Sequence, residues 1–97
     1  MTAINTLQVR LSEEPDQPLE QQMREYVADF SGKSGCLRYE ITRSDAEPCL
    51  WIISGHWSDA AQMTEHFESD AMKALVNLLI QARAHLVFGS AVQHPVD

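Results

Sequence analysis

Two side chains in the stretch SGHWSDAAQMTEHFESDAMKAL, residues 54–75, are suited to chemistry on an aromatic molecule: Trp57 and His66. An indole forms one wall of a pocket and offers a single N–H donor. A neutral imidazole takes a proton from a phenol or quinol near pH 7, or donates a hydrogen bond to its oxygen. The alternative for both residues is structural, a core tryptophan and a histidine that makes one hydrogen bond.

Four further side chains are candidates for lining a pocket that binds a flat, apolar substrate. Thioethers and aromatic rings provide soft apolar surface of this kind, although methionines at helical spacing are also typical of an ordinary core. These candidates are Tyr39, Met63, Phe67 and Met72.

Phosphate binding and metal binding find little support in the sequence. The tripeptide Gly32-Lys33-Ser34 has Val27 where a phosphate-binding loop requires a glycine, and it follows a predicted helix instead of opening one. His66 and Asp70 lie four residues apart on one predicted helix, which supplies two ligands at most. We therefore expect no metal.

Composition limits the class of protein. The chain has 97 residues, which predicts a single domain over residues 1–97. Its formal net charge of −7 disfavours nucleic acid and anionic membranes as partners, because both require a cationic surface. No apolar run is long enough to span a membrane, and no basic segment precedes an apolar one near residue 1, so we expect a cytoplasmic protein.

Hydrophobic periodicity predicts the elements that position these side chains. Alternation with period two indicates strands, as in Leu7-Gln8-Val9, and spacing of three to four indicates helices, as in Met23, Val27 and Phe30. The expected segments are a strand over 6–11, a helix over 19–30, strands over 36–42 and 49–57, helices over 58–67 and 69–79, and a strand over 86–92.

This order is β-α-β-β-α-α-β, an α+β, ferredoxin-like arrangement with an antiparallel sheet. Strands 36–42 and 49–57 are joined by a short turn and should form a hairpin, with Leu37, Tyr39 and Ile41 on one face. Ser58 is the expected N-cap of the helix that carries His66.

A second copy of the chain is the expected partner. The strand over 49–57 has apolar residues on both faces, Leu50 and Ile52 on one and Trp51 and Ile53 on the other. One face can pack on the helices, and the other needs a cover. A small chain also buries only part of its apolar surface alone, so we expect a homodimer built by sheet-on-sheet contact.

The stretches SGCLRYEITRS and PCLWIISGHWSDAAQMTEHFESDAMKAL resemble the antibiotic biosynthesis monooxygenase family of small dimeric α/β barrels. In that family a Gly-Cys-Leu-x-Tyr-Glu strand, here residues 35–40, precedes a hairpin and a strand that ends in Trp, here Trp57. A Ser-x-x-Ala helix with a late His follows, and then a Ser-led helix. Ser58, His66 and Ser69 occupy those positions.

The resemblance implies a fold and an activity. It implies a ferredoxin-like monomer whose sheet pairs with that of a second copy to close a barrel. It also implies oxygenation of a small aromatic or quinol-like substrate without metal, flavin or other cofactor, since the substrate carbanion reacts with dioxygen itself. Trp57 would orient the ring, and His66 would act as base or hydrogen-bond donor.

Two positions depart from the family pattern. Many relatives have Glu two residues before the tryptophan, where Gly55 stands, and a second His where Ala71 stands. These departures favour an alternative, a non-catalytic dimeric module that binds a small apolar ligand. An isomerase or decarboxylase on the same fold is a third interpretation. Haem degradation is not expected, because His66 and Val76 replace the Trp and the His ligand of that branch.

If His66 is a base, it must be neutral at the working pH. Nearby carboxylates, Asp70 above all, favour the charged ring, whereas burial against Met63 and Phe67 favours the neutral one. We expect a proton that is lost near neutrality, with activity rising through that pH.

Overall fold

The computed structural model describes residues 2–93. The elements follow the predicted β-α-β-β-α-α-β order. They are β1 (Thr2–Arg10), α1 (Gln17–Ser31), β2 (Cys36–Arg43), β3 (Leu50–Trp57), α2 (Ala60–Phe67), α3 (Asp70–Gln81) and β4 (His85–Gln93).

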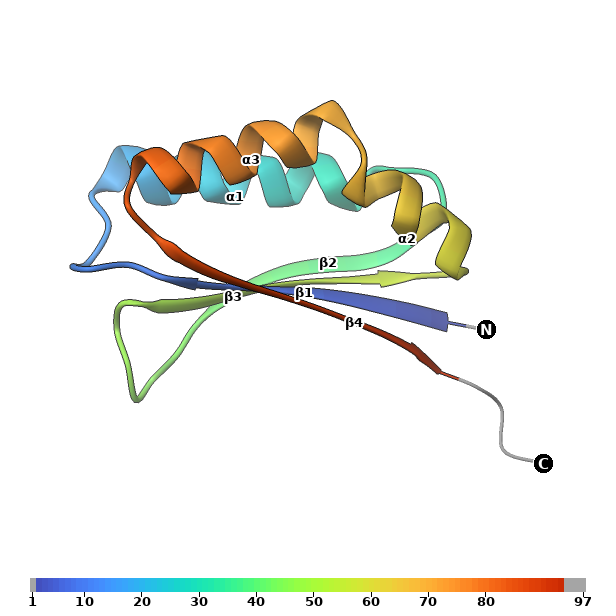
Figure 1. Cartoon of the computed structure of the whole chain (residues 1–97), viewed down its shortest axis with the longest axis horizontal. Coiled ribbons are helices and arrows are strands. Elements are labelled where there is room, and N and C mark those ends of the chain that lie inside the picture. The colour runs from blue at the N-terminus through green and yellow to red at the C-terminus, as the bar shows by residue number, and fades with distance from the viewer. Residues whose placement is uncertain (1, 94–97) are drawn as a thin grey trace.

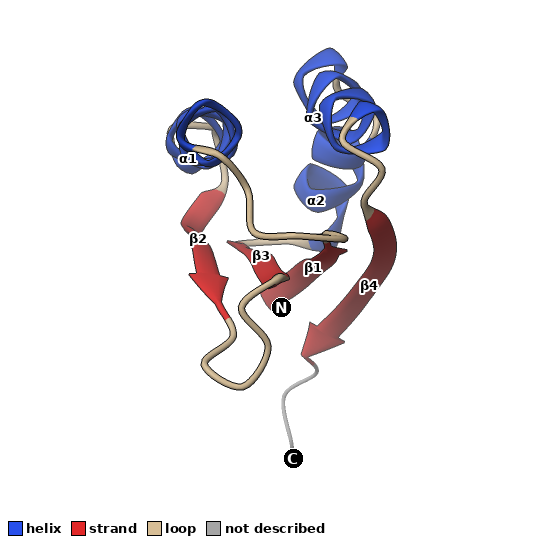
Figure 2. Ribbon diagram, turned by 90° about the vertical axis from the view of Figure 1, so that its left-hand side faces the viewer, coloured by secondary structure: helices blue, strands red, loops and turns tan. Residues whose placement is uncertain are grey.

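The four strands form one antiparallel sheet in the order β2-β3-β1-β4. All three helices lie on the same side of this sheet, with α1 above β2 and with α2 and α3 on the side of β1 and β4 (Figures 1 and 2). The α+β, ferredoxin-like prediction is confirmed, and β2 and β3 form the expected hairpin.

Capping side chains set where the helices begin. Asp16 accepts a hydrogen bond from the backbone N of Leu19 at 2.9 Å and starts α1. Asp59 accepts from the backbone N of Gln62 at 2.8 Å, so the N-cap of α2 is Asp59 and the prediction of Ser58 was wrong by one residue. Ser69 caps α3.

The core lies between the sheet and the helices. Along β3 the residues with odd numbers, from Trp51 to Trp57, are buried beneath the helices, and their even neighbours are half-buried on the other face. Along β1 the same alternation buries Ala3, Asn5, Leu7 and Val9. Asn5 is therefore a polar residue at an inward position.

One strand departs from the expected alternation. Cys36 lies opposite Trp57 and Arg38 lies opposite His56, so Leu37 is an extra residue without a cross-strand partner. This β-bulge turns Leu37 outward, where it is 61% exposed, and the prediction that it shares a face with Tyr39 was wrong. Tyr39 itself keeps the inward position and is buried.

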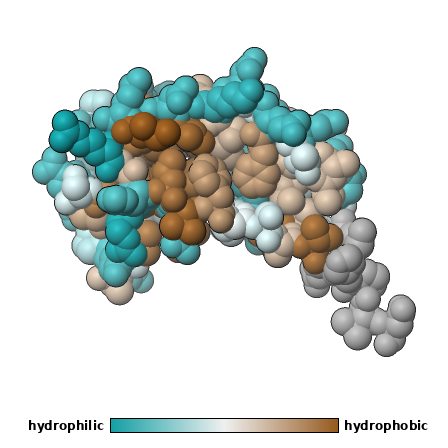
Figure 3. All heavy atoms as spheres, in the orientation of Figure 1, coloured by the Kyte–Doolittle hydropathy of each residue, from teal (hydrophilic) through white to brown (hydrophobic). Residues whose placement is uncertain are grey.

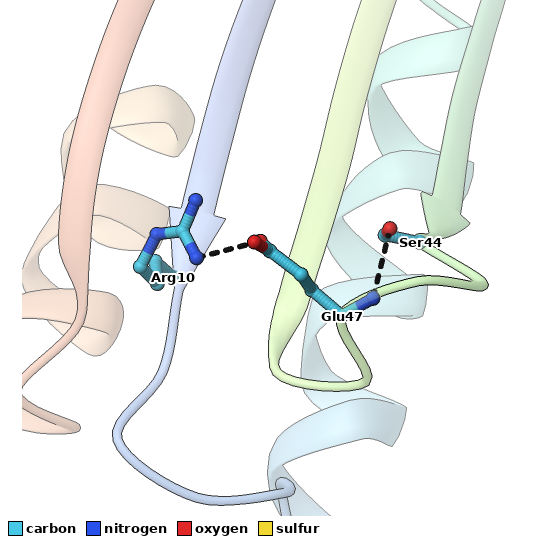
Figure 4. Close-up of polar contacts among 3 residues, drawn as sticks. All are labelled: Arg10, Ser44 and Glu47. Carbon is cyan, nitrogen blue, oxygen red and sulfur yellow. Dashed lines mark hydrogen bonds and ion pairs between the residues drawn. The ribbon is translucent and has the colours of Figure 1, made fainter.

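The hairpin loop is tied to the neighbouring strand at the end of the sheet away from His66. Glu47 accepts a hydrogen bond from Arg10 Nη1 at 2.6 Å, and the backbone N of Glu47 donates to Ser44 Oγ at 3.2 Å (Figure 4). All three side chains belong to the β2–β3 loop or to the end of β1. Because the ion pair is exposed, it fixes the loop position more than it stabilises the fold.

Within residues 2–93, no helix lies on the sheet face opposite α1, α2 and α3 (Figure 2). The residues of β3 on this face include Leu50 and Ile52, and Val87 of β4 lies opposite Gln8 on the same face. A further apolar patch lies on the side formed by α3 and β4 (Figure 3), where Ile80 and Phe88 are at least half exposed. The part of the chain that the structure describes holds no helix long and apolar enough to cross a membrane.

Candidate functional site

Three strands and one helix bring a row of polar side chains together beneath α2. Trp57 Nε1 donates a hydrogen bond to Asn5 Oδ1 at 2.7 Å, and Asn5 Nδ2 donates to Tyr39 Oη at 3.0 Å. Tyr39 Oη lies 2.8 Å from His66 Nε2. All four residues are buried, so the row Trp57–Asn5–Tyr39–His66 is an internal network.

The direction of each hydrogen bond follows from the first one. The indole N–H of Trp57 can only donate, so Asn5 must present its carbonyl oxygen to Trp57 and its NH₂ group to Tyr39. The hydroxyl of Tyr39 then has its own proton free to donate to His66 Nε2. The opposite direction would leave the buried Tyr39 proton without an acceptor, at a cost of about 1–3 kcal/mol.

This direction places the proton of the neutral His66 ring on Nδ1. Nδ1 is buried and has no hydrogen-bond partner among the described residues. A buried polar atom of this kind requires an explanation, because such groups are almost always paired. His66 therefore presents an unused N–H donor, which is suited to the oxygen atom of a bound molecule.

Burial and charge keep the His66 ring neutral. Desolvation, and then the positive charge of Lys33, lower the pKa of His66 from 6.5 to about 4. The prediction of a proton lost near neutrality was wrong, because the ring is more deeply buried than the border of a helical stripe suggests. Asp70 makes no hydrogen bond or ion pair with His66 and begins α3 instead.

Tyr39 stays protonated through the same range. Burial raises its pKa to about 12, although the hydrogen bond from Asn5 opposes this shift. The neutral phenol keeps its proton and donates it to His66 Nε2. This hydrogen bond holds the proton of the imidazole on Nδ1.

Gly55 explains why this network fits. Asn5 of β1 and Tyr39 of β2 are both direct cross-strand partners of Gly55 in β3, so the three residues form one row across the sheet. A Cβ at Gly55 would lie 2.5 Å from Asn5 Oδ1 and would clash with the Tyr39 ring. The glycine that replaces the family glutamate thus makes room for Tyr39 to reach Asn5.

Aromatic rings enclose the imidazole. Phe30 of α1 contacts His66 edge-on with ring centroids 4.5 Å apart, and the Trp57 ring lies 4.9 Å away. These contacts fix the orientation of the ring and exclude water from it. Trp51 belongs to a different cross-strand pair, opposite Arg43, and lies outside this group of rings.

A pocket of about 260 Å³ opens beside the network. Its lining includes both candidate catalytic residues, Trp57 and His66, which are nearly inaccessible and form its floor. The remaining lining residues are Lys33, Ser34, Gln62, Glu65 and Ser69. This volume lies just below the usual range for ligand sites, which favours a small molecule of one or two rings.

The candidate lining residues do not gather in that pocket. Tyr39 lies behind His66 and acts on it through the hydrogen bond. Phe67 and Met72 line a separate pocket of about 330 Å³ with Val76 and Phe88. Met63 is buried in the core between α2 and the sheet. Helical spacing places residues on a face, but it does not say which opening they border.

Sequence reasoning missed Asn5. Its signal is its place in the alternation Ala3, Asn5, Leu7, Val9, which puts an amide at an inward position of β1. The predicted strand began at residue 6, so this alternation was not followed back to Asn5. No three His, Cys, Asp or Glu side chains group into a metal site within residues 2–93, and His94 lies outside the described residues.

Comparison with known proteins identifies the family. The sequence model of the antibiotic biosynthesis monooxygenase family matches residues 1–78. The chain belongs to this family. A search of curated protein sequences finds no match. Membership confirms the resemblance in the Gly35–Glu40 strand and in the helix that carries His66. The matched range includes all four residues of the network.

Solved structures share the fold of this family member. A conserved protein from Methanosarcina mazei superposes with a TM-score of 0.84 at 15% identity, over 97% of this chain and 94% of that one. A protein from Shewanella oneidensis gives 0.80 at 19% identity, over 95% and 90%. SnoaB, a cofactor-independent oxygenase from Streptomyces nogalater, gives 0.73 at 11% identity, over 98% and 95%.

Acid is expected to destabilise the protein through His66. Because folding lowers the pKa from 6.5 to about 4, the unfolded chain takes up the proton first as the pH falls. The stability contributed by the neutral ring is complete above about pH 7.5, falls by about 2.5 kcal/mol on reaching pH 4.5, and levels off below pH 4. Urea unfolding between pH 7.5 and 4.5 measures this slope.

The matched variants for that measurement are His66→Gln, which removes the titrating ring, and His85→Gln, which removes an exposed one. His66→Gln is expected to flatten the pH dependence, and His85→Gln is expected to leave it unchanged. Equal slopes in all three proteins would contradict a neutral, buried His66.

Proposed function

We propose that the protein is a cofactor-independent monooxygenase that oxidises a small aromatic or quinol-like substrate with dioxygen. The observation that carries the proposal is the hydrogen-bonded row from Trp57 to His66, which ends in a neutral imidazole that lines a pocket and whose buried Nδ1 has no partner among the described residues. Family membership supports it, and the likeness in fold to the oxygenase SnoaB is consistent with it.

The proposed roles follow from the geometry. Trp57 forms the wall against which the substrate ring lies, and its N–H is already used by Asn5, so it contributes surface and no reactive proton. The Nδ1–H of His66 donates to the substrate oxygen that becomes negatively charged on deprotonation. A pre-oriented donor at a dry site stabilises that charge far better than water does.

The reaction balances without a cofactor. A substrate with an acidic CH₂ next to an aromatic ring, such as an anthrone, loses a proton to solvent at the open rim and becomes an enolate. One electron passes from the enolate to dioxygen, and the two radicals combine into a peroxide. Loss of water, in which the peroxide takes up that proton and releases the second CH₂ hydrogen, leaves a carbonyl. One oxygen atom ends in the product and the other in water.

Oxygen uptake with a panel of anthrones and hydroquinones tests the proposal, with mass spectrometry of the product formed under ¹⁸O₂. Uptake above the uncatalysed rate, with one labelled oxygen in the anthrone product, is the expected result. Bound ligand that is recovered unchanged after incubation in air would favour the non-catalytic binding module. Conversion without oxygen would favour an isomerase or decarboxylase.

We also propose that two copies pair through the uncovered sheet face. Support comes from the apolar side chains on that face, Leu50 and Ile52 of β3 and Val87 of β4, which the helices of the same chain do not reach. A chain of this length gains buried apolar surface from such a partner.

The expected result is a particle of twice the chain mass in light scattering at micromolar concentration. Ile52→Lys places a charge on the uncovered face and is expected to weaken the dimer by about a hundredfold. Ile80→Lys makes the same change at an exposed site on α3 and is expected to have no effect. A wild-type monomer would contradict this proposal.

A further inference from the structure

The pocket beside His66 has a floor and a rim of different chemistry. The floor is aromatic and nearly inaccessible, with Trp57 1% and His66 5% exposed. The rim is exposed and charged, with Lys33 on the α1–β2 turn and Glu65 on α2. A ligand that fills this pocket therefore meets an aromatic surface at its inner end and charged groups at its outer end.

The backbone holds Lys33 at this rim. The α1 helix ends at Gly32, and the backbone N of Lys33 donates to the carbonyl of Phe30 at 3.1 Å. Gly35 then takes a positive φ of 82°, and its carbonyl accepts a hydrogen bond from the backbone N of Ser58 at 2.8 Å. The turn that carries Lys33 is thus fastened to the start of the α2 segment.

The charge of Lys33 is not used elsewhere. Lys33 takes part in none of the ion pairs within the described residues, which join Arg10 to Glu47, Arg24 to Glu20, and Arg38 to Glu40. Its field reaches the floor of the pocket, because it contributes to the lowered pKa of His66.

We infer that the substrate of this pocket is an aromatic molecule that carries a carboxylate, with its ring against Trp57 and the carboxylate at Lys33. That this molecule is a substrate rests on the proposed function. That it binds rests on the pocket alone. Two observations carry it: a cation at the rim without an ion-pair partner among the described residues, and an aromatic floor that holds no second cation to compete for the anion.

The net charge of the protein repels such a ligand, so any preference for it must come from a local cation. The formal net charge is −7, so an anion gains nothing from the long-range field. A preference for an anionic ligand over its neutral amide must then come from a particular group. Lys33 is the lysine that lines this pocket, and Lys73 lines the separate pocket beside Phe67 and Met72.

Calorimetric titration with 2-naphthoate and 2-naphthamide tests the inference. Neither compound is oxidised by the proposed chemistry, so the result does not depend on catalysis. Wild-type protein is expected to bind naphthoate about three- to tenfold more tightly than naphthamide at low salt, and 0.5 M NaCl is expected to reduce this ratio. Lys33→Gln is expected to abolish the preference, and Lys33→Arg is expected to retain it.

Lys73→Gln is the matched control, because it removes the same charge from an exposed lysine at the other pocket. It is expected to leave the preference intact. No binding of either compound, no preference in the wild type, or a preference lost in Lys73→Gln but kept in Lys33→Gln would overturn the inference. Preferential binding of naphthoate, together with no oxygen uptake on the panel of anthrones and hydroquinones, would leave the inference standing and contradict the oxygenase.

Discussion

Replacing Gly55 with alanine is expected to lower the free energy of unfolding by about 3 kcal/mol and to break the hydrogen-bonded row beneath α2. The added methyl group would lie 2.5 Å from Asn5 Oδ1 and would overlap the Tyr39 ring, both of which are held by strands on either side. Forced overlap in a packed core costs about 1–3 kcal/mol, and each buried polar group that loses its partner adds a similar amount.

Urea unfolding measures this loss, and Gly32→Ala is its control. Gly32 ends α1 with a φ of −86°, and a Cβ there would meet a single backbone oxygen at an ordinary 3.5 Å. Gly32→Ala is expected to change stability by less than about 0.5 kcal/mol. A Gly55→Ala protein as stable as the wild type, with Tyr39 still bonded to Asn5, would show that the sheet can open at this row.

The role of Gly55 also bears on the departure from the family pattern. A glutamate side chain at this position could not coexist with the present placement of Tyr39 and Asn5, since even its Cβ has no room. In this chain the Trp57–Asn5–Tyr39–His66 row occupies the space that such a side chain would need. The missing glutamate is not by itself an argument against activity.

Changing His66 is expected to have the largest effect on the proposed oxygen uptake. Glutamine can keep the hydrogen bond to Tyr39 but has no N–H at the position of Nδ1, whereas asparagine can present an amide N–H near that position. His66→Gln is expected to lower kcat about a hundredfold, as loss of one pre-oriented donor does, and His66→Asn is expected to retain more activity. Oxygen electrode rates under saturating substrate give both values.

The same pair of variants separates a donor from a base. If Nδ1 took the substrate proton, glutamine and asparagine would fail equally, because neither amide is basic. Protonation would place a hydrogen on Nε2, where Tyr39 donates, and so break the row that orients the ring. Activity is therefore expected to stay level from pH 8 down to about pH 5 and to fall as the pH approaches the pKa of His66, about 4. His85→Gln, at an exposed site on β4, is expected to behave as the wild type.

Local sequence patterns were sufficient for the elements and for their order. Alternation in 50–57 and spacing of three to four in 17–31 are consequences of burying one side of a strand or helix, so they can be read without tertiary contacts. The first and last residues of the helices and strands were predicted less well. The N-cap of α2 is Asp59 and not Ser58, since either residue type can cap and the choice depends on how the chain leaves β3.

The bulge at Leu37 shows where such patterns fail. Leucine, tyrosine and isoleucine at positions 37, 39 and 41 form a regular alternation in the sequence, yet the pairing with β3 slips by one residue between Cys36 and Arg38. The slip depends on how the turn after α1 enters the sheet, which is a contact between distant segments. Period-two arguments assume unbroken pairing and cannot detect it.

The sequence by itself determined that Trp57 ends a strand, that His66 lies on the next helix, and that both belong to the frame of one family. Only the tertiary structure decided what they do to each other. Asn5 and Tyr39 join them because three strands place Asn5, Gly55 and Tyr39 in one row, and Lys33 reaches the same pocket from the far end of α1. Those neighbours come from segments up to 52 residues apart. The pKa of a buried group depends on such neighbours and on its burial, and the spacing of residues along the chain contains neither.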